Sequence, residues 1–123
     1  MNRLPLLIFL LAGLLSGCDT CRDTVKSRVV SPDRALAVSV YERNCGATTD
    51  FSSMVNVQAV SERFRGDDGT LFVARGRYDL SAVWIGPKAL LIRCSGCLRK
   101  DVYREVTALG DIDVAYSFSL RGK

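Results

Sequence analysis

The feature that most constrains this 123-residue chain is an alternation of apolar and polar residues with a period of two. It is clearest in the segment 112–119, whose apolar positions are Ile112, Val114, Tyr116 and Phe118. Successive side chains of a strand point to opposite faces, so this pattern predicts half-buried β-strands. Similar alternation, or enrichment in β-branched and aromatic residues, predicts further strands at 25–30, 36–41, 55–59, 70–75, 80–85, 90–93 and 101–107.

Residues typical of turns separate these segments. Pro32 stands where a type I turn needs a fixed φ, and Gly66, Gly69, Gly86 and Gly110 lie between other predicted strands. Strands of about six residues at this spacing predict an all-β fold, a small antiparallel meander that closes as a barrel or pairs as a sandwich. We also expect a short helix within 58–65, and Trp84 in the core.

The N-terminal segment has a different character. Arg3 is followed by an almost entirely apolar stretch from residue 4 to residue 15. A basic start, a short apolar run and small residues after it predict a secretory signal, and the run is shorter than the roughly 20 residues that span a bilayer. The alternatives are a signal peptide cleaved elsewhere, which leaves Cys18 free for a disulfide, and an uncleaved anchor helix, which Pro5 disfavours.

The apolar run ends in Leu15, Ser16, Gly17 and Cys18. This ending resembles the lipobox of bacterial lipoproteins. The resemblance implies cleavage after Gly17 and acylation of Cys18 by fatty acids such as palmitate, and several acyl chains hold a protein stably on a membrane. It places the chain on the periplasmic side of a bacterial cell envelope. Asp19 resembles the residue that keeps such proteins on the inner membrane of enteric bacteria.

Composition limits the mature chain further. Cleavage after Gly17 removes 17 of the 123 residues and leaves 106, which suffice for one domain with a small core. We expect a signal peptide at 1–17, a lipidated tether at 18–24 and a single β-rich domain at 25–123. The formal charge falls from +4 to +3 with the loss of Arg3, and the cations are scattered, which disfavours a nucleic-acid partner.

The chain has no histidine. Its absence removes the usual forms of Ser-His-Asp and Cys-His catalysis and the commonest metal ligand. We therefore expect neither an enzyme nor a cofactor or metal site.

Four cysteines remain besides Cys18: Cys21, Cys45, Cys94 and Cys97. In an exported chain they predict two disulfides, with three connectivities open. In the chain-entropy model a Cys45–Cys94 bridge stabilises by about 4 kcal/mol and a Cys94–Cys97 bridge by about 2 kcal/mol. This difference favours the long-range pair, although geometry can impose the local one.

Cys94 and Cys97 also form a C-x-x-C motif, which is typical of redox-active dithiols. The thioredoxin version needs a strand-to-helix junction, and residues 98–102 are not typical of a helix start. A zinc site from all four cysteines has the right ligand number, but only one close pair exists and the export route is oxidising. We favour structural disulfides over both alternatives.

The segment 42–53 joins two predicted strands and is longer than the roughly two to five residues of most hairpin loops. It is rich in hydroxyl groups, and a recognition loop would use Thr48, Thr49, Asp50 and Ser52 to bind a ligand or partner. The alternative, which we favour, is a loop pinned by a disulfide at Cys45, with hydroxyl groups that bind its own backbone.

The same segment carries a second resemblance. Its run from Arg43 to Thr49 reads Arg-Asn-Cys-Gly-Ala-Thr-Thr, with Phe51 and Ser52 downstream and Ser31-Pro32-Asp33 upstream. This motif is similar to that of an uncharacterised family of small bacterial exported proteins and lipoproteins. The chain departs from the family pattern at Arg34 and Asn44, where the pattern has Gly and Asp, and in its own Cys94/Cys97 pair. The resemblance implies export but no activity.

Together these patterns predict a membrane-anchored envelope lipoprotein with a binding or structural role. Its expected partners are the lipid bilayer, through acylated Cys18, and an envelope protein. One alternative is a periplasmic inhibitor or immunity-type protein that blocks a wall hydrolase or a toxin by inserting a loop. The second alternative is a thiol–disulfide protein that uses Cys94 and Cys97.

Overall fold

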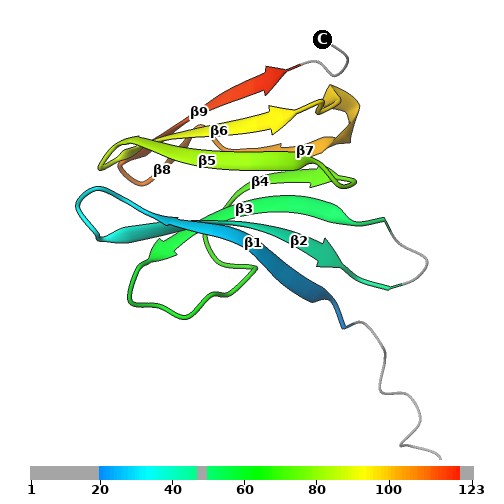
Figure 1. Cartoon of the computed structure of the whole chain (residues 1–123), viewed down its shortest axis with the longest axis horizontal. Coiled ribbons are helices and arrows are strands. Elements are labelled where there is room, and N and C mark those ends of the chain that lie inside the picture. The colour runs from blue at the N-terminus through cyan, green and yellow to red at the C-terminus, as the bar shows by residue number, and fades with distance from the viewer. Residues whose placement is uncertain (1–19, 47–49, 120–123) are drawn as a thin grey trace, which may run out of the picture.

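Two β-sheets face each other in the computed structural model, which describes residues 20–46 and 50–119 (Figure 1). The five-stranded sheet has the order β1-β2-β3-β4-β7, and the four-stranded sheet has the order β5-β6-β9-β8. The strands are β1 (Arg22–Val30), β2 (Leu36–Asn44), β3 (Ser52–Ala59), β4 (Thr70–Arg75), β5 (Asp79–Gly86), β6 (Ala89–Ser95), β7 (Val102–Glu105), β8 (Ala108–Leu109) and β9 (Ile112–Ser119). The prediction of an all-β fold is confirmed, and the sheets pair face to face as a sandwich.

The topology departs from a simple meander in the second half of the chain. Strands β1 to β4 pair with their sequence neighbours in antiparallel fashion. After β6 the chain makes a 3-10 turn, η2 (Arg99–Asp101), and crosses to the other sheet, where β7 pairs with β4. It then returns through β8, so that β9 lies parallel to β6. Alternation along a strand shows which residues share a face, but it does not show which strand becomes the neighbour.

Two boundaries differ from the sequence prediction. Strand β1 begins at Arg22, so the last residues of the expected tether at 18–24 belong to the sheet, where Asp23 pairs with Arg43. The expected helix within 58–65 is wrong, because β3 continues to Ala59 and residues 60–69 form a loop. The backbone N–H of Arg65 donates to the Gln58 side chain, a contact that ties the loop to the sheet and replaces a helical hydrogen bond.

The core lies between the two sheets. The five-stranded sheet contributes mainly valines and Phe72, and the four-stranded sheet contributes Leu80, Leu90, Ile92 and Val114. The Phe72 ring packs 5.7 Å from the ring of Tyr116, measured between centroids, and so joins the layers. The inward positions are the apolar set of each alternation, as the period of two predicts.

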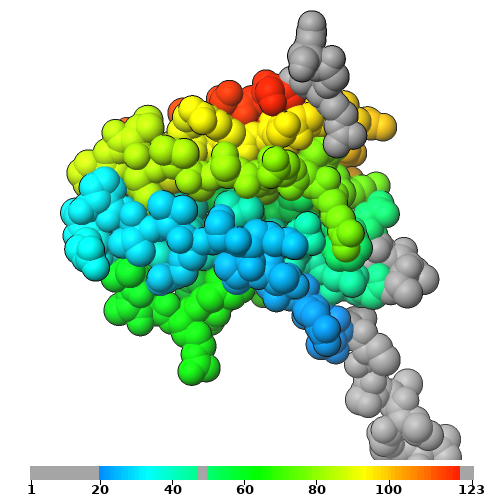
Figure 2. Space-filling view, viewed as in Figure 1, coloured from blue at the N-terminus to red at the C-terminus, as the bar shows by residue number. Residues whose placement is uncertain are grey.

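Strands β1 and β5 are both edge strands and lie along the same side of the sandwich (Figures 1 and 2). Trp84 of β5 is half-buried against the core, as the sequence predicts. Its indole Nε1 donates a hydrogen bond of 3.0 Å to the carbonyl oxygen of Val29 in β1. The hydrogen bond gives a donor to a carbonyl group on the unpaired edge of β1 and joins the two sheets along this side of the sandwich.

On the five-stranded sheet, the loop at residues 60–69 covers the outer face of β2 and β3, and it runs below the sheet in Figure 1. Fully buried Asn56 donates through Nδ2 to the carbonyl oxygens of Arg65 and Asp68, at 2.8 and 2.9 Å. The hydroxyl of buried Tyr41 donates to the carbonyl oxygen of Gly66. Polar side chains of the sheet therefore supply the partners that the loop backbone needs.

Candidate functional site

The disulfides, a charged cluster and a cleft lie at one end of the sandwich, here called the loop end. At this end β1 begins, β2 and β3 are joined through residues 45–51, β4 and β5 through 76–78, and β6 and β7 through 96–101. It lies at the right in Figure 1, on the side where the described chain begins at Thr20. The sequence alone does not predict that these three connections lie close together, because their proximity depends on which strands pair.

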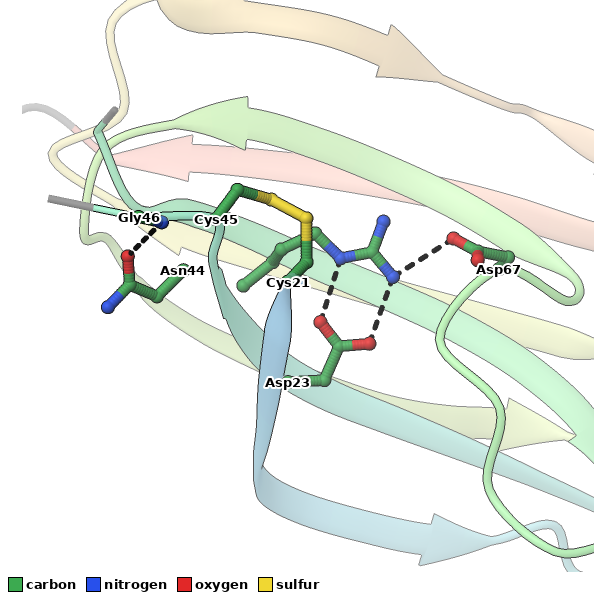
Figure 3. The surroundings of a disulfide bond; sticks show 7 residues. Cys21, Asp23, Asn44, Cys45, Gly46 and Asp67 are labelled. Atoms are coloured by element: carbon green, nitrogen blue, oxygen red, sulfur yellow. Dashed lines mark hydrogen bonds and ion pairs between the residues drawn. A yellow bond between two sulfur atoms is a disulfide. The ribbon is translucent and has the colours of Figure 1, made fainter. Parts of the chain in front are cut away.

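A disulfide between Cys21 and Cys45 closes the loop end, with 3.9 Å between the two Cα atoms (Figure 3). It joins the residue before β1 to the residue after β2, two positions that the pairing of Arg22 with Asn44 brings together. In the chain-entropy model a bridge across this separation of 24 residues contributes about 3.5 kcal/mol. The second disulfide joins Cys94 and Cys97.

The long-range Cys45–Cys94 pairing favoured by the sequence argument is therefore wrong. Cys45 follows β2 of the five-stranded sheet, whereas Cys94 lies in β6 of the other sheet. Chain entropy rewards the closure of long loops, but the sheet pairing decides which sulfur atoms can meet. Pairing also separates the four cysteines into two sites, which removes the geometry for a shared zinc site.

A charged cluster beside the Cys21–Cys45 bridge was missed by the sequence analysis (Figure 3). The Arg43 guanidinium donates to both carboxylate oxygens of Asp23, at 2.7 and 2.9 Å, and its Nη2 lies 2.9 Å from Asp67 Oδ1. The hydrogen bonds to Asp23 raise the pKa of Arg43 further above its usual value. This fork connects β1, β2 and the 60–69 loop, and its Asp23–Arg43 ion pair joins two residues that lie directly opposite each other in the paired strands.

The structure describes two of the four residues of the predicted recognition loop. Thr48 and Thr49 lie outside the described residues. Asp50 is exposed, with its Oδ2 at 3.9 Å from Arg75 Nε. Ser52 is the first residue of β3, where it pairs with Arg43 and Arg75, so its assignment to the loop is wrong. The backbone N–H of Gly46 donates to Asn44 Oδ1, a self-bonded contact of the kind that the favoured alternative predicts (Figure 3).

A cleft of about 290 Å³ opens at the loop end between β1 and β5. Its lining residues are Lys26, Val40, Tyr41, Glu42, Ser53, Tyr78, Asp79 and Leu80. The Glu42 carboxylate lies 3.7 Å from Lys26 Nζ and 3.8 Å from Arg77 Nε. Ser53 donates to the Gly76 carbonyl and accepts from the Tyr78 N–H, so its hydroxyl holds the β4–β5 connection. The lining residues of the cleft therefore offer charges of both signs.

Exposed cations at the loop end stack on aromatic rings. The guanidinium carbon of Arg77 lies 3.6 Å from the centroid of Phe51, and that of Arg75 lies 5.4 Å from the centroid of Tyr103. Tyr103 is 61% exposed, and Leu98 in the neighbouring connection is 50% exposed. Stacking of this kind keeps the ring and the charge together at an exposed surface.

The surroundings of Cys94 and Cys97 differ from those of a redox-active dithiol. Both residues are buried, at 1% and 8% exposure. One 3-10 turn, Arg99–Asp101, follows them in place of an α-helix whose N-terminus could lower a thiol pKa. Within residues 20–46 and 50–119, no three His, Cys, Asp or Glu side chains are close enough to hold a metal ion.

The part of the chain that the structure describes contains no helix long and apolar enough to cross a membrane. The predicted signal peptide and the predicted lipid attachment site, Cys18, lie outside that part. Comparison with family models, curated proteins and solved structures gave no match to this chain.

Proposed function

We propose that this chain is a lipid-anchored binding protein of the bacterial cell envelope, tied to the bilayer through acylated Cys18. Its domain would face the periplasm and act by contact with an envelope partner, with no catalytic step. The lipobox-like ending at Leu15–Cys18 and the resemblance of the Arg43–Thr49 motif to exported lipoproteins motivate this proposal. The two disulfides support it, because bridges of this kind persist in oxidising compartments outside the cytosol.

The observation that carries the proposal is the position of the Cys21–Cys45 bridge. Cys21 follows Cys18 by only three residues, and the bridge joins it to β2 of the folded domain. Three extended residues span roughly 11 Å, so an acyl group on Cys18 would hold the loop end close to the lipid surface. The segment between Cys18 and Cys21 is therefore too short to let the domain move far from its anchor.

The same geometry bears on what the domain would bind. The 45–51 connection lies at the anchored end, which favours the lipid surface rather than a periplasmic protein as its neighbour. The outer face of β5, β6 and β9 points away from the five-stranded sheet and exposes Val83 and Ile85. We assign the contact with an envelope protein to this face. An inhibitor or immunity-type function would then use a sheet face instead of an inserted loop.

Metabolic labelling with a radioactive or alkyne fatty acid tests the anchor. We expect the wild-type protein to be labelled and to fractionate with membranes, and Cys18→Ser to lose both properties. The double variant Cys21→Ser/Cys45→Ser is the matched control, because it removes two other cysteines and must retain the label. Labelling of the Cys18→Ser protein, or an unlabelled wild type, would refute the proposal.

A thiol titration separates the binding proposal from the thiol–disulfide alternative. For the mature acylated protein without reductant we expect no free thiol, because all four remaining cysteines are paired. Burial of Cys94 and Cys97 further predicts slow reduction by glutathione buffers. Rapid, reversible cycling of this pair would instead support the redox function.

A further inference from the structure

We propose that the loop end of the sandwich lies directly on an anionic phospholipid surface. This inference rests on the proposed lipid anchor and specifies which surface of the domain meets the bilayer. The contact surface consists of Phe51, Arg77, Leu98 and Lys100 from the three connections that meet at this end, together with Arg75 at the end of β4 and Tyr103 near the start of β7.

The predicted lipid anchor has a short reach. The Cys21–Cys45 bridge fixes the start of β1 against the end of β2, so the sandwich cannot move away from Cys21 by unpairing its first residues. Arg22 and Asp23 are held in the same pairing, and Asp23 is held again by Arg43. With roughly 11 Å of chain between Cys18 and Cys21, the nearest part of the domain to the bilayer is the loop end.

The loop end exposes side chains of the kind found at membrane–water interfaces. Leu98 and Tyr103 are two of the most exposed large apolar residues in the described chain, and they lie in or beside the 96–101 connection. Tyrosine is enriched at membrane–water interfaces, where its ring meets the headgroups and its hydroxyl meets water. An apolar side chain that is costly to expose in water can be buried among lipid headgroups and upper acyl chains.

Exposed cations at the loop end complement the charge of anionic phospholipid headgroups. The side chains of Arg75 and Arg77 are 58% and 61% exposed, and the carboxylates nearest to them, Asp50 and Glu42, lie at 3.9 and 3.8 Å. These long contacts leave guanidinium N–H groups available for phosphate oxygens. Lys100 has no ion pair among the described residues. Basic residues close to a membrane are attracted by anionic headgroups, and the attraction falls with salt.

Among the described residues, the opposite end of the sandwich differs in its charges and in its rings. Its turns carry Asp33 and Asp111 together with cations, and Lys88 is paired with Asp111 at 3.6 Å. The exposed apolar side chains nearest this end, Val30 and Ile85, are aliphatic, whereas Tyr103 at the loop end is the only aromatic residue among the exposed large apolar side chains of the described chain. An orientation with the loop end toward the lipid therefore brings together the aromatic, apolar and basic groups that an anionic membrane binds.

Hydrogen exchange of the mature acylated protein in lipid nanodiscs tests the orientation. Nanodiscs of phosphatidylcholine with phosphatidylglycerol are compared with nanodiscs of phosphatidylcholine alone and with detergent micelles. We expect amides at 97–103 to exchange several-fold more slowly in the anionic nanodiscs, with partial loss of protection in high salt. Amides at 31–36 and 108–113 should exchange equally in all three.

Variants provide the control. Leu98→Ser and Lys100→Glu should each weaken the protection of 97–103, whereas Val83→Ser, at a comparably exposed apolar position on the β5 face, should leave it unchanged. Equal exchange of 97–103 in micelles and both nanodiscs overturns the proposal, as does protection confined to the β5 face or independent of anionic lipid. The mass of the purified protein shows separately whether Cys18 is acylated, so loss of the anchor is distinguished from failure of docking.

Discussion

The two sheets of the sandwich differ in how far the side chains on their outer faces are buried. On the five-stranded sheet, Ser39, Asn56 and Gln58 are buried, and the side chains of Asn56 and Gln58 donate to backbone carbonyl groups of the 60–69 loop. On the four-stranded sheet the corresponding positions of β5, β6 and β9 are exposed, among them Ser81, Arg93 and Ser117. Polar residues on an outer strand face can therefore be structural on one sheet and available for contact on the other.

The difference has an energetic consequence. A buried amide without its hydrogen bonds costs about 1–3 kcal/mol, whereas an exposed serine on a sheet can be replaced at almost no cost. We therefore expect the covered face to tolerate few substitutions and the uncovered face to tolerate many. The following variants test this expectation, from the largest effect to the smallest.

Gly69→Ala should destabilise most. Gly69 has a φ of +65°, and a Cβ there would lie 1.9 Å from the carbonyl oxygen of Val57. The Gly69 carbonyl also accepts from the Val57 N–H, so the loop cannot shift without losing that bond. We expect a loss of about 3 kcal/mol or more in the free energy of unfolding, measured by denaturant titration.

Gly110→Ala is the matched control for this variant. Gly110 has a φ of +62°, but no atom lies within 4 Å of the position of its added Cβ. We expect a cost of only about 1 kcal/mol, from backbone conformation alone. An equal loss in the free energy of unfolding for the two variants would show that the 60–69 loop is not packed closely against β3.

Asn56→Ala removes the side chain that binds the loop backbone at two carbonyl oxygens. We expect a loss of about 2–3 kcal/mol and faster hydrogen exchange throughout 60–69, because those carbonyl groups lose their donor. Ser117→Ala on the uncovered face should change stability by less than about 0.5 kcal/mol. An Asn56→Ala protein as stable as Ser117→Ala would remove the distinction between the faces.

The ionisation of Tyr41, on the covered face, should make the stability of the protein depend on pH. Burial raises the pKa of the Tyr41 hydroxyl to about 12, so the folded state favours the protonated phenol. The stability that this provides is complete below about pH 10, the usual value for tyrosine, and is lost as the pH rises toward 12. We expect Tyr41→Phe to cost about 1 kcal/mol at neutral pH and to reduce the fall in stability between pH 10 and 12.

Ultraviolet absorbance measures the same effect, because ionised tyrosine absorbs at longer wavelength. Burial also raises the pKa of Tyr116, whose hydroxyl lies 2.7 Å from the Val106 carbonyl oxygen. In the wild type, both Tyr41 and Tyr116 should titrate late, and Tyr41→Phe should lose the part of the late absorbance that comes from Tyr41. Unchanged late absorbance in the variant would mean that Tyr41 is accessible to solvent.

Ile85→Ser on the uncovered face should have the smallest effect. Ile85 is 62% exposed, and we expect a change of less than about 0.5 kcal/mol in a monomeric protein. The experiment is repeated over a range of protein concentrations. A loss of more than about 2 kcal/mol that grows with concentration would show that a second copy covers this face.

The alternation of residues predicts most strands and their inward faces, because the period of two is a local property. Asn56 and Gln58 occupy the outward positions that it predicts, yet they are buried, because residues 60–69 fold back over them. The parallel pairing of β6 with β9 and the Cys21–Cys45 bridge also depend on which strands become neighbours. No local pattern contains that information. The fork of Asp23, Arg43 and Asp67 was missed for the same reason.

The most direct test of the account is a tryptic digest of the membrane-extracted protein under non-reducing conditions, analysed by mass spectrometry. Cleavage after Arg22, Arg43 and Arg63 leaves Cys21 in peptide 18–22 and Cys45 in peptide 44–63, while Cys94 and Cys97 share peptide 94–99. We predict an acylated peptide 18–22 linked by a disulfide to peptide 44–63. An unacylated Cys18, or a bridge from Cys45 to peptide 94–99, would contradict the account.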